Sequence, residues 1–327
     1  MHDRQNALSK WLEQILASTQ FTLIPLTGDA SFRRYFRLHY KGSTQVIMDA
    51  PPDKETLEPF LAIADLLSTN GLSTPKIHAV DKKQGFAILD DFGDTLLLHA
   101  LSSQPADKLY KAAMDTLNIL QLNTISKAAQ LPPFDKNFIL YELNLFKEWF
   151  LHAYLKLNLS TTEEALISQT FDWLSAEVTK QPNVLIHRDY HSRNIMLLEQ
   201  DDKIKLGIID FQDAMYGPFT YDLVSLLKDC YIQWPREQVM SWLSYFYEHS
   251  SLAKQYSLPD FIRAFDYCGL QRHLKVLGVF SRLYLRDNKP SYLQDMPLTL
   301  HYVVACLECY PQFDSFYHFI QNRVRLP

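Results

Sequence analysis

The chain carries near its middle the stretch Val184-Leu-Ile-His187-Arg188-Asp189-Tyr-His191-Ser-Arg193-Asn194-Ile-Met-Leu-Leu198. Two short apolar runs flank a polar loop, in which an aspartate is followed by an asparagine five residues later. A second aspartate, Asp210, comes directly after the next apolar run, Leu206 to Ile209. Short apolar runs bounded by polar residues are typical of buried strands. We therefore expect the three polar side chains to lie in loops where strands end.

The order of these residues is that of a phosphoryl-transfer site. In the pattern H-R-D-x-x-x-x-N, the aspartate orients or deprotonates an acceptor hydroxyl, and the asparagine holds a metal ion on the nucleotide phosphates. Asp189 and Asn194 have that spacing, and Asp210-Phe-Gln212 differs from the kinase D-F-G only in its last residue. A lone H-R-D tripeptide arises by chance, but this ordered set does not. We predict that Asp189 is the catalytic base, that Asn194 and Asp210 bind Mg²⁺, and that ATP is the donor.

The pattern of the first third of the chain differs from that of the rest. A helix is expected over residues 5–18, short strands over 21–26, 35–39, 45–49, 76–80 and 86–89, and a further helix between the third and fourth strands. Helical patterns dominate after Gly93. We predict an α+β, bilobal, protein-kinase-like fold. Residues 1–92 would form a small nucleotide-binding N-lobe with an antiparallel sheet and one packed helix, and residues 93–327 a larger, mainly helical C-lobe with the catalytic loop and substrate site.

Composition narrows the class of partner. The 327 residues are 47% hydrophobic and 21% charged, and 32 basic against 37 acidic residues give a net charge of -5. This charge offers no broad positive field for nucleic acid. No stretch reaches the roughly 18 apolar residues of a membrane span, and the N-terminus lacks the apolar core of a signal peptide. We expect a cytoplasmic protein with neither nucleic acid nor membrane as a partner.

The nucleotide site is marked more weakly than the catalytic loop. We expect the adenine against the backbone of the hinge that begins at Asp90 and includes Phe92, and the phosphates under the turn from Gly28 to Ser31. This turn lacks G-x-G-x-x-G, so by itself it is more often an ordinary hairpin.

One expected phosphate contact is missing. The lysine of the kinase V-A-I-K motif should fall at about Met48, and no lysine is there. Arg33 or Arg34, on the strand after the turn, are the candidates to replace it. The alternative is that both arginines are solvated surface charges.

The residues around these motifs resemble those of a known family. His187-Arg-Asp-Tyr-His-Ser-Arg-Asn194 and Asp210-Phe-Gln-Asp-Ala-Met-Tyr-Gly-Pro-Phe-Thr-Tyr-Asp-Leu-Val-Ser-Leu-Leu-Lys-Asp229 are similar to the aminoglycoside phosphotransferase-like kinases. Within that group the chain most resembles the anomeric N-acetylmuramate/N-acetylglucosamine kinases of bacterial cell-wall recycling. The resemblance extends to residues 28–37, 46–52 and 269–278, and so spans nearly the whole chain.

This resemblance implies a specific reaction. The sugar's C1 hydroxyl would be phosphorylated, and a separate sugar-1-phosphate uridylyltransferase would convert the product into a nucleotide sugar during peptidoglycan recycling. The resemblance also implies that Asp222 anchors the catalytic loop and does not touch the substrate.

Sugar recognition pairs hydroxyls with fixed polar groups and lays an apolar or aromatic face on the ring. The candidates are Arg193, Asp213, Tyr216, Arg272 and His273. The last two interrupt an apolar helix pattern. They would bind a lactyl carboxylate or a sugar hydroxyl, or they form a partly buried pair satisfied by neighbouring carbonyls.

Two other functions stay open. A kinase of another small alcohol or amine, such as an aminoglycoside, choline or homoserine, would use the same catalytic loop. An aminoglycoside pocket should be rich in carboxylates, whereas the C-terminal segment mixes acidic with basic residues; a choline site needs an aromatic cage, which the 18 Tyr and 20 Phe leave open. A nucleotide-binding pseudokinase is suggested by the missing lysine, but all three catalytic polar residues are retained.

Overall fold

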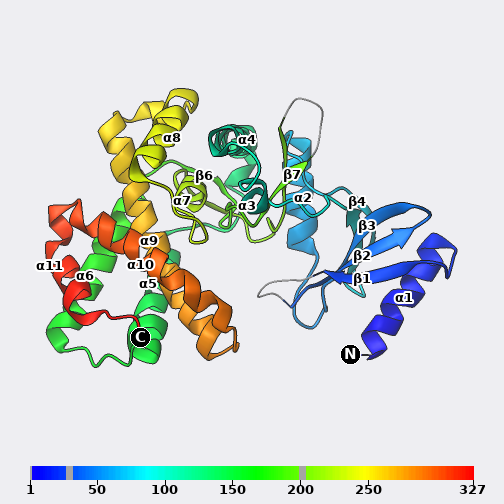
Figure 1. Cartoon of the computed structure of the whole chain (residues 1–327), viewed down its shortest axis with the longest axis horizontal. Coiled ribbons are helices and arrows are strands. Elements are labelled where there is room, and N and C mark those ends of the chain that lie inside the picture. Colours follow the sequence, from blue (N-terminus) through cyan, green and yellow to red (C-terminus); the bar gives the residue numbers. More distant parts are fainter. Residues whose placement is uncertain (1, 27–31, 199–203) are drawn as a thin grey trace.

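The strands of the N-terminal third form one antiparallel sheet in the order β1-β2-β3-β5-β4. The bounds are Thr22–Leu26 for β1, Arg34–Tyr40 for β2, Ser43–Asp49 for β3, Ile77–Asp81 for β4 and Phe86–Asp90 for β5. The computed structural model describes residues 2–26, 32–198 and 204–327 (Figure 1). All five expected strands are confirmed, and they build the smaller lobe.

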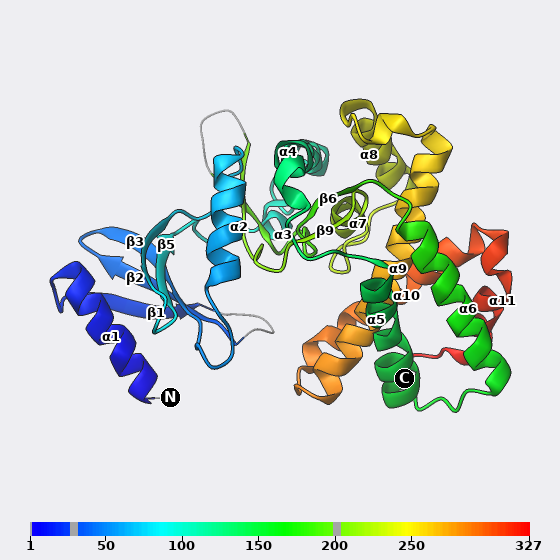
Figure 2. The ribbon, with the colours of Figure 1, turned by 180° about the vertical axis from the view of Figure 1, so that it is seen from behind.

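A helix covers each face of this sheet, because side chains along a strand alternate between its two faces. On the outer face, Phe36, Ile47 and Ile88 pack against the apolar stripe of α1 (His2–Leu16). On the other side, α2 (Glu58–Thr69) lies between the sheet and the rest of the chain (Figures 1 and 2). The buried side chains of α2 belong to one hydrophobic core with residues of both lobes.

Helices build most of the larger lobe. They are α3 (Leu97–Ala100), α4 (Ala106–Ala128), α5 (Lys136–Leu145) with a π-helical continuation (Phe146–Tyr154), α6 (Thr161–Val178), α7 (Tyr221–Leu227), α8 (Arg236–His249), α9 (Leu258–Leu285), α10 (Met296–Glu308) and α11 (Asp314–Arg323). Local sequence sets several starts: Ser160 and Glu163 form a capping box at α6, and Ser257 caps α9. None of the described helices is long and apolar enough to cross a membrane.

The long helix α9 runs close to α5, and this contact positions the site below. A Cβ added at Gly278 would lie 2.3 Å from the carbonyl carbon of Leu145. Only glycine therefore allows the two helices to approach at this point. The close approach brings the polar residues of α9 under the catalytic loop.

Two short strand pairs frame that loop. Strand β6 (Asn183–Ile186) pairs with β9 (Met215–Pro218), and β7 (Ile195–Leu198) pairs with β8 (Lys205–Ile208), both antiparallel. The chain thus has the α+β, two-lobed organisation predicted. The proposed lobe boundary at residues 92/93 falls between the end of β5 and the start of α3.

Candidate active site

The backbone at the start of the catalytic loop is held by one buried carboxylate. Asp222, in the first turn of α7, accepts hydrogen bonds from His187 N at 2.6 Å and from Arg188 N at 3.0 Å. The backbone is strained at Arg188, which has a φ of +76°. This geometry confirms that Asp222 anchors the loop.

The imidazole of His187 links this loop to the segment before the second aspartate. Its Nε2 lies 3.0 Å from Ile209 O, and Asp189 N donates to its Nδ1 at 3.3 Å. Both contacts are satisfied by the tautomer that carries its proton on Nε2. Asp210 follows with a φ of +63°. His187 therefore fixes the two catalytic segments relative to each other.

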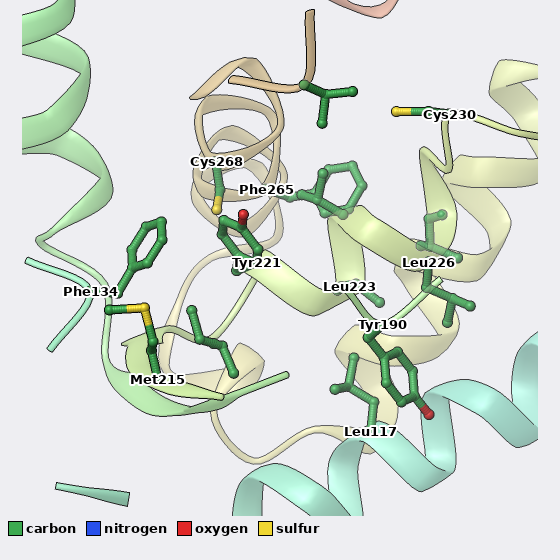
Figure 3. Packing of buried hydrophobic residues seen from close by; sticks show 14 of the residues in the cluster. Leu117, Phe134, Tyr190, Met215, Tyr221, Leu223, Leu226, Cys230, Phe265 and Cys268 are labelled. Carbon is green, nitrogen blue, oxygen red and sulfur yellow. The ribbon is translucent and has the colours of Figure 1, made fainter. Parts of the chain in front are cut away.

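Buried and outward residues alternate along the loop. Tyr190 is fully buried, points toward Leu117 of α4 (Figure 3), and donates from its hydroxyl to Ala113 O at 2.9 Å. Ser192 is buried too, and its N and Oγ both donate to Asp229 Oδ2, at 3.0 and 2.5 Å. These anchors leave Asp189 partly exposed.

Asn194 contacts both Asp189 and Asp210, the other two residues that the sequence singled out. Its Nδ2 donates to Asp189 O at 3.1 Å and lies 3.4 Å from Asp210 Oδ2. A carboxylate and an amide oxygen are donors that suit Mg²⁺, which takes its other ligands from phosphates and water. Within the described ranges, no group of three or more His, Cys, Asp or Glu side chains could hold a metal alone. The amide and carboxylate oxygens of Asn194 and Asp210 therefore fit a Mg²⁺ ion that takes its remaining ligands from a nucleotide and water.

The glutamine that replaces the kinase glycine takes part in this arrangement. Gln212 Nε2 donates to Asp210 Oδ1 at 3.0 Å and to Asp213 Oδ2 at 3.2 Å. It thereby fixes one oxygen of the proposed metal ligand.

Positive side chains surround Asp189. Arg272, on α9, is almost fully buried and places Nη2 3.8 Å from Asp189 Oδ1. Burial raises the pKa of Asp189, but Lys275, His191, Arg272 and Arg188 together outweigh burial and hold this pKa well below its usual range. The carboxylate is therefore ionised at any physiological pH.

A buried glutamate holds these cations together. Glu142, on α5, accepts from Arg188 Nη2 at 2.9 Å and from Gln271 Nε2 at 3.0 Å, and its Oε1 lies 3.8 Å from Lys275 Nζ. Neither Glu142 nor Lys275 was predicted as a site residue. A lysine inside an apolar helix pattern was the available indication of the second, whereas no motif marks the first.

The two candidate arginines of the small lobe lie on opposite faces of its sheet. Arg34 shares the outer face with α1, and its Nε donates to Asp49 Oδ2 at 3.0 Å; Arg4 binds the other oxygen of Asp49 at 2.6 Å. The predicted phosphate contact by Arg34 is therefore wrong, because strand alternation turns it away from the large lobe. Arg33 faces the other way, with Nε 2.6 Å from Glu55 Oε2.

The hinge is tied to both lobes. Arg37, on β2, donates to Asp91 Oδ2 at 2.7 Å and to Asp94 Oδ2 at 3.0 Å. The ring of Phe92 packs so closely on β8 that a Cβ at Gly207 would lie 2.6 Å from it. The Asp90 carboxylate is turned toward β4, where its Oδ1 meets His78 Nε2 at 2.7 Å. The other two predicted nucleotide residues, Gly28 and Ser31, lie outside the described residues.

The predicted acceptor residues are placed differently from one another. The Arg193 guanidinium lies 3.6 Å from the ring centroid of Tyr231. Asp213 is exposed. Tyr216 belongs to β9, and its backbone pairs with Pro132 O and Phe134 N. Among the described residues, no hydrogen bond joins Tyr216 to the catalytic loop.

His273 does not face the site. It is 1% exposed, its Nε2 lies 2.9 Å from Lys228 O, and its ring stacks on Tyr302. Burial lowers the pKa of His273 to about 3, so the imidazole is neutral. The second interpretation, a side chain satisfied by a neighbouring carbonyl, holds for this residue, and its predicted contact with substrate does not.

The chain is similar to known proteins in both sequence and structure. A model of the phosphotransferase enzyme family matches residues 22–264. An N-acetylmuramate/N-acetylglucosamine kinase of Neisseria meningitidis serogroup B is 37% identical over 320 residues, or 96% of this chain and 94% of that protein. An N-acetylmuramate/N-acetylglucosamine kinase of Pseudomonas aeruginosa is 39% identical over 293 residues, or 89% of this chain and 85% of that protein. An ethanolamine kinase from Plasmodium vivax has a TM-score of 0.64 at 15% identity, over 90% of this chain and 83% of that one. This last likeness confirms the kinase-like fold.

Proposed function

Because this chain belongs to the phosphotransferase enzyme family, we propose that it transfers the γ-phosphate of ATP to the C1 hydroxyl of N-acetylmuramate, N-acetylglucosamine or both. The meeting of Asp189, Asn194 and Asp210 at one point is the observation that carries the phosphoryl-transfer step. The choice of sugar is supported by three relatives bearing that name, which are 37–39% identical over 86–96% of this chain.

In this proposal Asp189 acts on the acceptor. Its carboxylate accepts a hydrogen bond from the C1 hydroxyl, whose oxygen forms a bond to the γ-phosphorus as the bond to the β,γ-bridging oxygen breaks. The hydroxyl proton passes to Asp189, and ADP leaves. A carboxylate of low pKa is a weak base, which suits a loose transition state in which the proton moves late.

Asn194 and Asp210 would hold Mg²⁺ through the amide Oδ1 and the carboxylate. The ion, when bound, supplies positive charge against the β- and γ-phosphates. Gln212 orients Asp210 by donating to Oδ1. This hydrogen bond preserves the ligand's direction although the kinase glycine is absent.

The adenine would lie against the backbone of residues 90–93. Arg37 supports this role, since its ion pairs with Asp91 and Asp94 fix the hinge to β2. Phe92 fixes the same segment to β8.

The acceptor would bind near the end of the catalytic loop. Stacking on Tyr231 fixes the position of the Arg193 guanidinium, and a guanidinium pairs well with a lactyl carboxylate. Asp213 is suited to accept from a sugar hydroxyl. Arg272 is assigned to orienting Asp189, because its guanidinium is buried.

The product of this reaction is a sugar 1-phosphate. Such a compound is the substrate of a uridylyltransferase, which forms a nucleotide sugar from it. We infer that the chain acts with such an enzyme in peptidoglycan recycling in the cytoplasm.

An acceptor panel tests the proposal. The full chain with ATP and Mg²⁺ should release ADP with N-acetylmuramate or N-acetylglucosamine, and should not do so with their C1 methyl glycosides. Choline, ethanolamine and kanamycin should give background rates. Turnover with the C1-blocked sugars would contradict the site of transfer, and turnover with an amine or alcohol alone would contradict the sugar.

A further inference from the structure

We propose that Arg33, paired with Glu55, supplies the phosphate-binding cation that Met48 cannot provide. The inference rests on the proposed use of ATP and adds the residues that hold its phosphates. Kinases place a lysine on the third strand and pair it with a glutamate of the helix that follows. In this chain the arginine comes directly before the neighbouring strand β2 and pairs with Glu55.

The strand register shows that a side chain at position 33 can replace one at position 48. Tyr35 on β2 lies directly opposite Met48 on β3, and its hydroxyl lies 3.6 Å from Met48 Sδ. Arg33 precedes Tyr35 by two residues, so both side chains share the face opposite α1. The guanidinium therefore starts from the residue directly before β2, the strand next to the vacant lysine position, and lies on the same side of the sheet as Met48.

The acidic partner is also in a matching place. Glu55 lies between the end of β3 and the start of α2, the single helix on that face. Its Oε2 is 2.6 Å from Arg33 Nε, and the Arg33 side chain is only 8% exposed. A buried arginine held by a carboxylate has a fixed direction, and its five N–H donors can serve a carboxylate and a phosphate together.

The face that carries this pair contacts the segment of the proposed metal site, because Phe60 of α2 stacks on Phe211, the residue after Asp210, with ring centroids 5.1 Å apart. Burial raises the pKa of Tyr35 to about 12, and the charges of Arg33 and Asp210 both act on that same hydroxyl. In this proposal the guanidinium would hold a phosphate of the nucleotide whose Mg²⁺ is held by Asp210. Met48 itself is fully buried and uncharged, so it offers no cation of its own.

Comparing the binding of ATP with that of adenosine separates loss of a phosphate contact from a general effect on the nucleotide site. We would measure ATP with Mg²⁺ and adenosine alone by calorimetry on the wild type, Arg33→Met and the matched control Arg34→Met. Loss of a charged hydrogen bond should weaken ATP binding about 10- to 100-fold in Arg33→Met. Adenosine binding should change less than about twofold, and it also reports that the variant is folded.

A second variant, which moves the positive charge from position 33 to position 48, completes the test. Met48→Lys in the Arg33→Met chain restores a cation beside Glu55 and should recover most of the ATP affinity. Unchanged ATP affinity in Arg33→Met, or equal weakening of ATP and adenosine, would overturn the inference. Neither result depends on which sugar is phosphorylated. A failed sugar assignment would leave the ATP result intact.

Discussion

Arg272 Nη2 lies 3.8 Å from Asp189 Oδ1, so a buried cation from α9 stands directly behind the proposed base. Its side chain is 4% exposed, and burial of a charge is costly unless a partner compensates. Asp189 is such a partner, and the Cys230 thiol, with Sγ 4.0 Å from Nη1, adds a weak hydrogen-bond acceptor. The relationship suggests that Arg272 positions Asp189 and keeps it ionised.

Replacing Arg272 tests that role. Arg272→Met removes the charge but keeps an apolar side chain, and we expect kcat to fall about 10- to 100-fold while KM for ATP changes less than about twofold. Arg272→Lys should recover part of kcat. If only KM for the sugar rises, Arg272 is a substrate ligand and does not position the base.

The anchor of the loop gives the activity a pH dependence. Burial raises the pKa of Asp222 to about 6. Above that pH the carboxylate accepts from both His187 N and Arg188 N; below it, a protonated carboxyl turns an O–H toward one of these donors. We expect kcat to fall as the pH drops through about 6, measured by stopped assays from pH 5 to 8. A flat profile over this range would contradict the anchoring role.

The buried glutamate contributes to stability through the cations that it holds. Glu142→Leu leaves Arg188 and Lys275 without their shared partner, and we expect the free energy of unfolding to fall by about 3–5 kcal/mol. Urea denaturation measures this change. Glu164→Gln, which breaks the partly exposed pair with Lys147, should cost less than about 1 kcal/mol. Similar losses in the two variants would argue against a buried charge cluster.

His273 predicts how stability responds to acid. Its pKa is about 3 in the folded state, below the ordinary value of 6.5, so the unfolded chain binds a proton that the folded chain lacks. Between those values its contribution to stability falls as the pH falls, by at most about 1.4 kcal/mol per pH unit. His273→Gln should therefore lose less stability than the wild type between pH 7 and pH 5. The exposed control His318→Gln should match the wild type.

Short-range spacing made the meeting of the three proposed catalytic residues predictable. Asp189 and Asn194 lie in one loop, and Asp210 ends the next strand pair, so local chain geometry brings them together. The five strands were also predictable from alternation and turns. Glu142 and Lys275 were not, because they reach the loop only through the packing of α5 against α9.

Two pairs of adjacent residues show a second limit of prediction from the sequence, because the members of each pair point in different directions. Arg33 and Arg34 point to opposite sheet faces, and the sequence does not say which face α1 covers. Arg272 and His273 are about 100° apart around one helix. One therefore faces the catalytic loop and the other faces Lys228. Only the tertiary arrangement assigns these directions.

The most direct measurement is a ³¹P NMR spectrum of the full chain with ATP, Mg²⁺ and N-acetylmuramate or N-acetylglucosamine. We expect ADP signals and a new phosphate resonance coupled to a single anomeric proton, both absent with the isosteric variant Asp189→Asn. A new resonance coupled to two protons, as for a phosphate on C6, would contradict transfer to C1. Persistence of only the ATP signals, in protein that binds ATP, would contradict the sugar kinase itself.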